Sequence, residues 1–538
     1  MIDIKELATN PHWVNGKYSA FWDFLLQAYE GGIDYCNASV SNSKSGGLWD
    51  YLFSVYVNGK KQDTSFKYGN LFMHPRERAE DYQRRLDMSY YYNFCSPIID
   101  IYSNHLFKNP VVEDWEELEG TIEEVEDDID FTGSSIGEFR KEIATMAQLY
   151  GHIFVIVDSP AIPTDALITL ADQIEMRAFP YLSIHIPQNV LNWSLDEYGK
   201  PYWVLIREIS EGNPDPATYD KKNAFKIQYR LWTRTQWFLY SADYQQIEFG
   251  THNSPGTVPI ACIFAKKSKK ARNFLGVSDL ADISFISRDI YNSCSELKQI
   301  LRDQTFSFLA INGDASEYSE LEVGIGKGLL YPEGREKPSY ISPPTANAEV
   351  YFAHIDRQVA KIFQLAKLDS GGVSGQVSNP SNPGIADQQS GVSKAWDFNQ
   401  TNSALSDKAG NLEDGEMKIW QLYAKLLGTE FTGSVSYPNE FSISSMMDDL
   451  TELEKVARLD FGKTFNIEVR KAIIKKKFPR KEDDDIEEMA TEIENDIQEK
   501  KTQMMGGNGF NPNVANRFSA IFNKNKTLNK AEIPNKGE

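Results

Sequence analysis

Few residues in this sequence favour a secreted, membrane-spanning or disulfide-stabilised protein. The 538 residues include only four cysteines, far apart and without a Cys-x-x-Cys pair, so we expect reduced, buried thiols rather than disulfides or a zinc site. No apolar run approaches the roughly 18–20 residues that span a bilayer. The opening MIDIKELATN lacks the basic and apolar parts of a signal peptide. These absences predict a soluble, non-secreted chain.

Motifs that carry enzyme chemistry are absent as well. FGKTF, the nearest approach to a phosphate-binding loop, has Ala457 where that motif requires its first glycine. The seven histidines are scattered, and His152 and His185 fall in strand-like runs where a satisfied structural role is expected. The sequence therefore predicts no catalytic residue, no metal and no cofactor, and a protein that is not an enzyme. A carbohydrate-active enzyme is an alternative that only the aromatic content and the many carboxylates support.

The charge balance limits the partners of the chain. Lys and Arg number 56 against 77 Asp and Glu, a formal net charge of −21. Such acidity argues against tight, static binding of nucleic acid over most of the surface, because phosphate contacts require positive charge. It leaves open a passage through which DNA moves without sticking. Hydrophobic residues at 41% and the length of the chain predict three or four globular units.

Periodicity predicts a mixture of helices and strands, an α+β protein. A helical pair is expected over 74–107, a helix that stops at Gly151 comes next, and IFVIV at 153–157 is typical of a buried strand. Alternating residues over about 178–270 predict a β-rich region. The region 438–538 is helical in pattern, with blocks of charge.

The middle of the chain predicts helix, small β insert, helix, loop and helix. An apolar stripe predicts one long amphipathic helix over 275–304, and a second helix is expected over 346–368. A third helix is predicted from near Val392 to a stop at Gly428, with polar Asn402 and Glu416 interrupting its stripe. The stripes consist of Val277, Leu280, Ile283, Ile286, Ile290, Cys294, Leu297 and Leu301, then Phe352, Ile355, Val359, Ile362 and Ala366, then Phe398, Leu405, Ala409, Leu412, Ile419 and Tyr423.

The loop over 369–390 is unusually long and neutral. Between Asp369 and Asp387 the sequence SGGVSGQVSNPSNPGIA has no charged residue, and its glycines and Asn-Pro pairs forbid regular structure. Loops of this length inside a domain are usually functional, disordered or linkers. A linker without a role is the simple alternative.

Two basic runs stand out in the acidic chain. KKSKKAR at 266–272 holds Lys266, Lys267, Lys269, Lys270 and Arg272, and it is either a solvated loop or a contact to phosphate or a partner. RKAIIKKKFPRK at 470–481 is interrupted by apolar residues, which favours an amphipathic helix over a nucleic-acid patch.

Several phrases, in this order, resemble the portal proteins of tailed bacteriophages. They are YQRRLDMSYYYNFCSPIIDIYSNHLFKNPV, GEFRKEIATMAQLYGHIFVIVDSP, PQNVLNWSLDEYGK with Asn192 and Trp193, and SGVSKAWDFNQTNSALSDKAGNLEDGEMKIWQLYAKLLG. The resemblance covers about 74–430 and contains no catalytic motif. It implies an α/β wing, a helical stem, a small β-containing clip, a helical crown and a ring oligomer. The implied parts are 1–274 N-terminal wing, 275–304 stem helix, 305–345 clip, 346–368 stem helix, 369–390 tunnel loop, 391–437 long wing helix and following segment, and 438–538 crown and C-terminal tail.

The resemblance also implies a function and partners. The expected ring, a dodecamer at the capsid portal vertex of the virion, conducts double-stranded DNA non-specifically during packaging and ejection. It docks the terminase large subunit, head-tail adaptor proteins and the major capsid protein, and it forms in the host cytoplasm without contacting a membrane. ATP hydrolysis is expected to belong to the terminase. A virion scaffold that binds only protein is the alternative.

The implied site residues fall into three sets. Stem packing is expected from Leu280, Ile283, Ile286, Ile290, Leu297, Leu301, Ile355, Val359 and Ile362. Channel-facing positions are Ser370, Gly371, Gly372, Gln376, Asn379, Asn382, Gly384 and Gln388, and clip positions are Lys327, Arg335 and Lys337. A neutral polar loop can touch phosphates without the strong grip of lysine.

Overall fold

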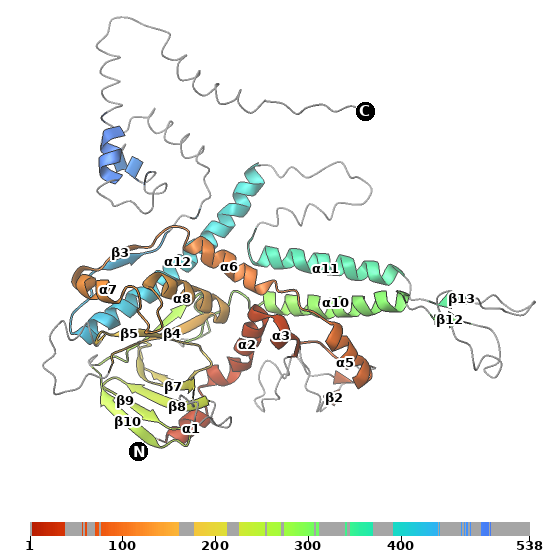
Figure 1. Ribbon diagram of the computed structural model, residues 1–538, viewed down its shortest axis with the longest axis horizontal. Helices are drawn as coiled ribbons and strands as arrows, with labels where there is room; N and C mark the ends of the chain where they lie inside the picture. The colour runs from red at the N-terminus through yellow and green to blue at the C-terminus, as the bar shows by residue number, and fades with distance from the viewer. Residues whose placement is uncertain are drawn as a thin grey trace, which may run out of the picture. The chain divides into compact units, whose positions relative to one another are not determined.

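The computed structural model (Figure 1) describes residues 3–37, 56–57, 60–61, 70–74, 77–160, 177–211, 225–252, 256–270, 274–305, 308–310, 339–341, 345–368, 391–438 and 441, and in the C-terminal part 464, 467–468, 470–471, 474, 486–493 and 495. The chain divides into two units, Met1–Ser442 and Ile443–Glu538, which are described separately. Helices and strands both contribute to the first unit, in agreement with the expected α+β class.

The N-terminal part of the first unit is mainly helical. The predicted helical pair over 74–107 is confirmed as α5 and α6, and α8 ends where the sequence predicts. The elements are α1 Ile4–Thr9, α2 Trp13–Glu30, α3 Gly32–Asn37, β1 Tyr56–Val57, β2 Lys60–Lys61, α5 Ala79–Met88, α6 Cys95–Leu106, β3 Val112–Asp114, η1 Glu116–Leu118, α7 Glu119–Val125 and α8 Ile136–Tyr150.

Two antiparallel sheets follow, which confirms the predicted β-rich region. The three-stranded sheet has the order β11-β4-β5, and the five-stranded sheet has the order β10-β9-β8-β7-β6. Strand β4 is the predicted buried IFVIV segment. The strands are β4 His152–Asp158, β5 Tyr181–His185, β6 Val190–Leu195, β7 Pro201–Glu211, β8 Phe225–Thr233, β9 Gln236–Tyr240, β10 Gln246–Thr251 and β11 Ile260–Phe264.

The junction between α8 and β4 depends on a glycine. A capping box of Ser135 and Glu138 begins α8, and Gly151 ends it in the left-handed conformation with φ of 88°. A Cβ atom at Gly151 would lie 2.6 Å from the backbone nitrogen of Ser278. The glycine therefore provides both the turn and the space for a distant segment.

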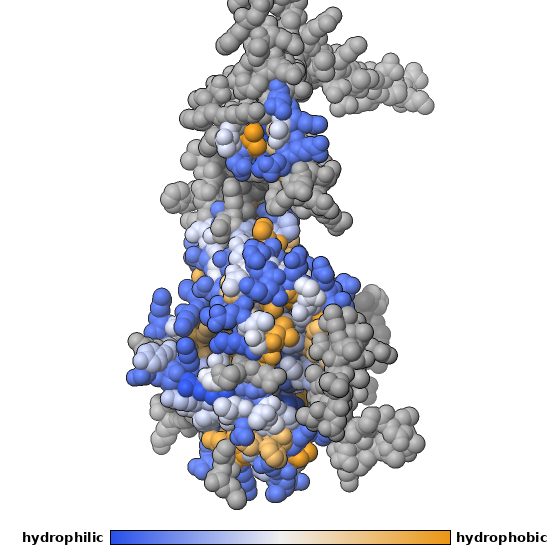
Figure 2. All heavy atoms as spheres, turned by 90° about the vertical axis from the view of Figure 1, so that its left-hand side faces the viewer, coloured by the Kyte–Doolittle hydropathy of each residue, from blue (hydrophilic) through white to orange (hydrophobic). Residues whose placement is uncertain are grey.

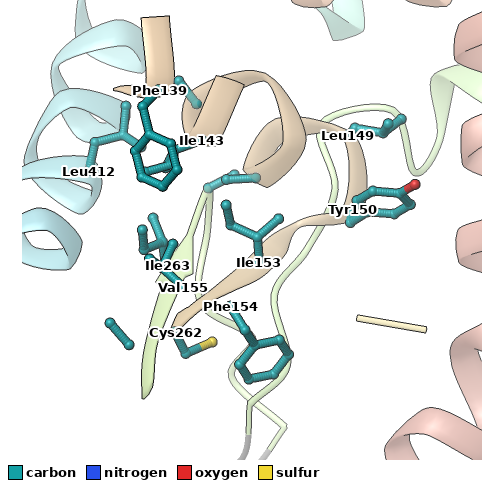
Figure 3. Close-up of a cluster of buried hydrophobic side chains, with 14 of the residues drawn as sticks. Phe139, Ile143, Leu149, Tyr150, Ile153, Phe154, Val155, Cys262, Ile263 and Leu412 are labelled. Carbon is teal, nitrogen blue, oxygen red and sulfur yellow. The ribbon is translucent and has the colours of Figure 1, made fainter. Parts of the chain in front are cut away.

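The main core lies where α8, β4, β11 and α12 (Gly391–Leu427) meet (Figure 3). Phe139 and Ile143 of α8, Val155 of β4, Ile263 of β11 and Leu412 of α12 are all at most 5% exposed. Gly415 allows the close approach of α12, because a Cβ there would lie 3.0 Å from the Ile263 side chain. Buried apolar area of this kind is the main stabilising term of the unit.

The predicted long helix over 275–304 is shorter than expected at its N-terminus. Helix α10 is Ile283–Thr305, and the residues before it are bonded to the body instead. The N–H of Val277 donates to the carbonyl of Lys266, and that of Asp279 donates to the carbonyl of Gln148. Because these donors are used across the chain, 274–282 follows an irregular path, and the apolar spacing of Val277 and Leu280 does not arise from a helix.

The remaining predicted helices form close to their expected bounds. Helix α11 is Thr345–Leu365, and α12 runs from Gly391 to Leu427 with Gly428 in the left-handed conformation after it, as predicted. Strands β12 Phe308–Ala310 and β13 Ser339–Ile341 form a pair between α10 and α11, and β14 Ser434–Ser436 pairs with β3.

The surface of the first unit keeps an apolar area on the five-stranded sheet. Ile209, Ile227, Ile247 and Phe249 are between 38% and 63% exposed. In Figure 2, hydrophobic residues gather at the lower end of the face in view, at the height where Figure 1 places β9 and β10. Among the helices within the described ranges, none has the length and apolarity needed to cross a bilayer.

The described residues of the second unit form a small helical cluster. Ile474 and Ile486 are buried in it, and the Nζ atom of Lys471 lies 3.0 Å from Glu487 Oε2. An apolar side that packs and a lysine that pairs at the surface agree with the amphipathic interpretation of the run at 470–481.

Candidate functional site

The candidate site is the antiparallel hairpin formed by α10 and α11, which lie side by side in Figure 1. Polar contacts join the two helices. The Tyr351 hydroxyl donates to Glu296 at 2.7 Å, and Gln358 Nε2 donates to Asp289 at 2.7 Å. His354 Nε2 lies 3.0 Å from the same Asp289 carboxylate oxygen. These contacts fix the register of the helices, while apolar residues fill the space between them.

The β12–β13 pair closes the end of the hairpin that lies away from the body. Phe308 pairs with Ile341 and Ala310 pairs with Ser339, so the insert leaves and returns at the same place. This is the β-type insert that the sequence predicts. The clip positions Lys327, Arg335 and Lys337 lie outside the described residues.

Polar anchors hold α10 on the N-terminal helices. Asn292 accepts from the N–H of Phe72 at 2.7 Å and donates to the carbonyl of Asn70 at 3.0 Å. Close by, Arg85 pairs with Glu77 at 2.7 Å, with 7% and 10% of the two side chains exposed. Burial works against the charge of Glu77, but Arg85 and the His74 N–H hold its pKa below the ordinary value. The base of the hairpin is therefore fixed to the body.

A buried arginine on α10 was not found from the sequence. Arg288 is 7% exposed, and its guanidinium carbon lies 4.9 Å from the ring centre of Phe24 and 5.1 Å from that of Phe72. Burial lowers the pKa of Arg288 to about 10. Aromatic faces attract a cation at this distance. Its position on the packed side of the helix was the only sequence signal.

The predicted stem residues differ in how far they are buried. Leu280, Ile283, Ile290, Leu297 and Ile362 are at most 7% exposed. Ile286, Ile355 and Val359 are half-buried and pack against the core. Leu301 is 42% exposed, and on α11 Val350 and Phe352 are 69% and 51% exposed. The hairpin therefore packs its base on the body and keeps apolar side chains on its surface.

The two ends of the predicted tunnel loop are held close together. The Thr401 hydroxyl of α12 donates to the carbonyl of Lys367, just after α11, and the Tyr102 hydroxyl donates to the carbonyl of Ala366. The loop positions Ser370, Gly371, Gly372, Gln376, Asn379, Asn382, Gly384 and Gln388 lie outside the described residues.

The basic run is exposed and does not lead directly into a helix. Lys266, Lys267, Lys269 and Lys270 are all exposed, and Lys267 bridges to Gly276 through the backbone. Lys270 Nζ donates to the Tyr18 hydroxyl at 3.2 Å. Arg272 lies outside the described residues. The run is thus a surface turn beside 274–282.

The cysteines and histidines show no arrangement for chemistry. All four cysteines are free, but only Cys95 and Cys262 are buried as expected. His152 is fully buried, with Nδ1 accepting from the Gly276 N–H at 3.2 Å and Nε2 without a partner among the described residues, so it is less satisfied than expected. Within the parts of the chain that the structure describes, no group of three His, Cys, Asp or Glu side chains is placed to hold a metal.

Comparison with known proteins gives weak structural matches only. No family model and no curated protein matches the chain. Three solved structures are a chain of the virion of the native gene transfer agent particle (10% identity, TM-score 0.34, 68% of this chain and 84% of that chain), one of the neck of the empty particle computed with C6 symmetry (11%, 0.35, 68% and 85%), and one of the neck of the native particle computed with C12 symmetry (11%, 0.36, 70% and 87%). Similarity at this level defines neither a family nor a function for the chain.

Proposed function

We propose that this chain is a portal-type subunit of a phage-like virion, which forms a ring around a channel for double-stranded DNA. The observation that carries the proposal is the α10–α11 hairpin, with a paired β insert at one end and a long neutral loop beginning after Leu368 at the other. The order of elements is the one expected of stem, clip and tunnel loop.

The hairpin suits side-by-side assembly. A ring is built from heterologous contacts, in which one surface of a subunit meets a different surface of the next. The exposed apolar residues Leu301, Val350 and Phe352 provide surface that a neighbouring hairpin could bury. The fixed base, with Asn292 and Arg288 packed into the body, would keep all copies at one angle. In such a ring the loops between α11 and α12 would repeat around the axis.

The charge distribution agrees with a channel through which DNA slides. A net charge of −21 in each copy repels the duplex from the walls, and the loop between Asp369 and Asp387 brings polar groups without charge. Such a surface permits brief phosphate contacts without salt-dependent trapping. In this proposal the clip binds the terminase and the head-tail adaptors, and the outer surface binds the capsid protein.

The test is negative-stain electron microscopy of the purified full-length chain, with class averages along the symmetry axis. Rings with a central hole are the expected result. A non-ring oligomer would instead favour a virion scaffold that binds only protein. If the chain is monomeric alone, co-expression with the capsid protein of the same particle is the second arm, and absence of rings there contradicts the proposal.

A further inference from the structure

A cleft of about 620 Å³ lies between the β6–β7 turn, β11 and the C-terminal half of α12. Its volume falls within the range of about 300–1,000 Å³ that is usual for small-molecule sites. Five basic side chains line it, and no acidic side chain does. They are Lys200, Arg234, Lys267, Lys418 and Lys425. In a chain with a net charge of −21, this is a local reversal of sign.

Most of these cations have no carboxylate partner. Arg234 is the exception, because its Nη2 lies 2.7 Å from Asp196 Oδ2. Lys425 Nζ donates only to the Thr257 hydroxyl, at 3.4 Å. Among the residues that the structure describes, the other three lysines also make no ion pair. Like charges gathered in a concave site repel one another and raise the local concentration of anions.

The cleft also has an apolar floor. Ile260, Cys262 and Leu422 are each at most 8% exposed, and the rings of Phe264 and Phe274 complete the lining. Burial raises the pKa of the Cys262 thiol well above its ordinary value, and the charges of Lys418 and Lys267 oppose part of that rise. The thiol therefore stays neutral, and the lysines lie close enough to act on it.

We infer that the cleft binds closely spaced phosphate groups carried by a ligand with an apolar or planar part. Four lysines without carboxylate partners require several negative charges within one small volume. Each terminal phosphate brings between one and two charges on one centre, whereas an acidic peptide brings one per residue. Lysine binds phosphate as a point charge, and Arg234 is already occupied by a carboxylate.

Two sources supply this chemistry, a free nucleoside oligophosphate and the phosphates of a nucleic-acid strand. The site is assembled from residues between Leu195 and Lys425, so no contiguous phosphate-binding motif could reveal it. The inference goes beyond the proposed function and does not depend on a ring.

The experiment is isothermal titration calorimetry of the full-length chain with tripolyphosphate, at low and at physiological salt. The cleft variant is Lys418→Glu with Lys425→Glu, and Lys418→Gln with Lys425→Gln is the milder form if folding is affected. The control, Lys5→Glu with Lys226→Glu, makes the same charge change at exposed lysines outside the cleft. Adenosine triphosphate, a 5′-phosphorylated single-stranded oligonucleotide and an acidic peptide are then titrated.

We expect tripolyphosphate to bind the wild type and the control equally, and the cleft variant at least about tenfold more weakly, since each lost charge-assisted contact is worth roughly that factor. Tighter binding of adenosine triphosphate than of the oligonucleotide identifies the free ligand, and the reverse identifies a strand. The inference is overturned if tripolyphosphate does not bind, if cleft and control variants lose affinity equally, or if only the acidic peptide binds. Electron microscopy of the same variants reports on rings separately, so the two proposals can fail independently.

Discussion

Arg140 on α8 and Glu416 on α12 form an ion pair inside the protein, with Nη2 and Oε1 2.6 Å apart and 6% of each side chain exposed. Trp420 Nε1 donates to the same carboxylate at 2.9 Å, and the Tyr437 hydroxyl donates at 2.6 Å. Burial opposes the charge of Arg140, yet Glu416 holds the pKa of the guanidinium above its ordinary value. The contact joins two helices of the first unit that are far apart in sequence.

We expect Glu416→Ala to lower the free energy of unfolding by about 3–5 kcal/mol, because it leaves a buried arginine without its partner. Thermal unfolding of the full-length chain measures the effect. Glu123→Ala, an exposed carboxylate on α7, is the control and should change stability by less than about 0.5 kcal/mol. Equal effects of the two substitutions would show that the pair does not stabilise the fold.

Stability should fall as the pH is lowered, in part through His152 and His185. Burial lowers the pKa of His152 to about 3 and that of His185 to about 4, from an ordinary 6.5. Below pH 6.5 the unfolded chain therefore binds protons that the folded chain does not, and each histidine removes up to about 1.4 kcal/mol per pH unit. His152→Phe should flatten the pH dependence between about 6.5 and 4 in denaturation experiments. A curve that is unchanged in slope would contradict a neutral, buried His152.

Gly151→Ala should destabilise the junction of α8 and β4. The residue has a φ of 88°, and the added Cβ would lie 2.6 Å from the Ser278 nitrogen, so both strain and a clash with backbone are introduced. A loss of about 2 kcal/mol or more is expected in thermal unfolding. Gly120→Ala in α7, where the Cβ meets no atom within 4 Å, is the matched substitution and should stabilise by up to about 1 kcal/mol. Similar melting temperatures for both variants would be inconsistent with the packing described.

Leu297→Asp should disrupt the packing of α10, because Leu297 is 7% exposed and the substitution buries an unpaired ion. We expect a loss of about 3 kcal/mol or more of stability and a loss of ring assembly. Ile286→Asp should have a smaller effect on the isolated subunit, since Ile286 is only half-buried. Leu301→Asp, one turn further along and 42% exposed, tests surface contacts between copies without disturbing the subunit. An unchanged oligomer and melting temperature for Leu297→Asp would mean that the stripe faces solvent.

Deletion of 370–386 tests the role of the loop. The flanking residues are fixed by the bond from Thr401 to the Lys367 carbonyl, so the deletion should leave folding and ring assembly intact. In a packaging assay we expect reduced DNA retention or packaging. Rings that package and retain DNA normally would identify the segment as a linker, and failure to assemble would exclude the proposed channel role.

Local pattern was sufficient to predict most elements of the first unit. Apolar spacing predicted α5, α6, α11 and α12, and a glycine in the left-handed conformation ended α8 and α12 as expected. Alternation predicted the strands of the two sheets. These features follow from backbone geometry and from the need to bury one face, which nearby residues determine.

Tertiary contacts decided where the pattern ended and which residues met. Helix α10 begins at Ile283 because Val277 and Asp279 bond to the body. Glu416, an interruption in an apolar stripe by sequence, is the centre of a buried network because Arg140 reaches it from α8. The basic cleft likewise joins residues from three distant segments.

The sequence by itself determined the secondary structure, the acidity and the neutral loop, since these depend on neighbouring residues and on composition. The tertiary structure alone decided which charges are paired and which converge in a cleft. The reason is physical: a charge is stabilised or left exposed by groups within a few ångströms, and folding brings those groups together from any distance along the chain.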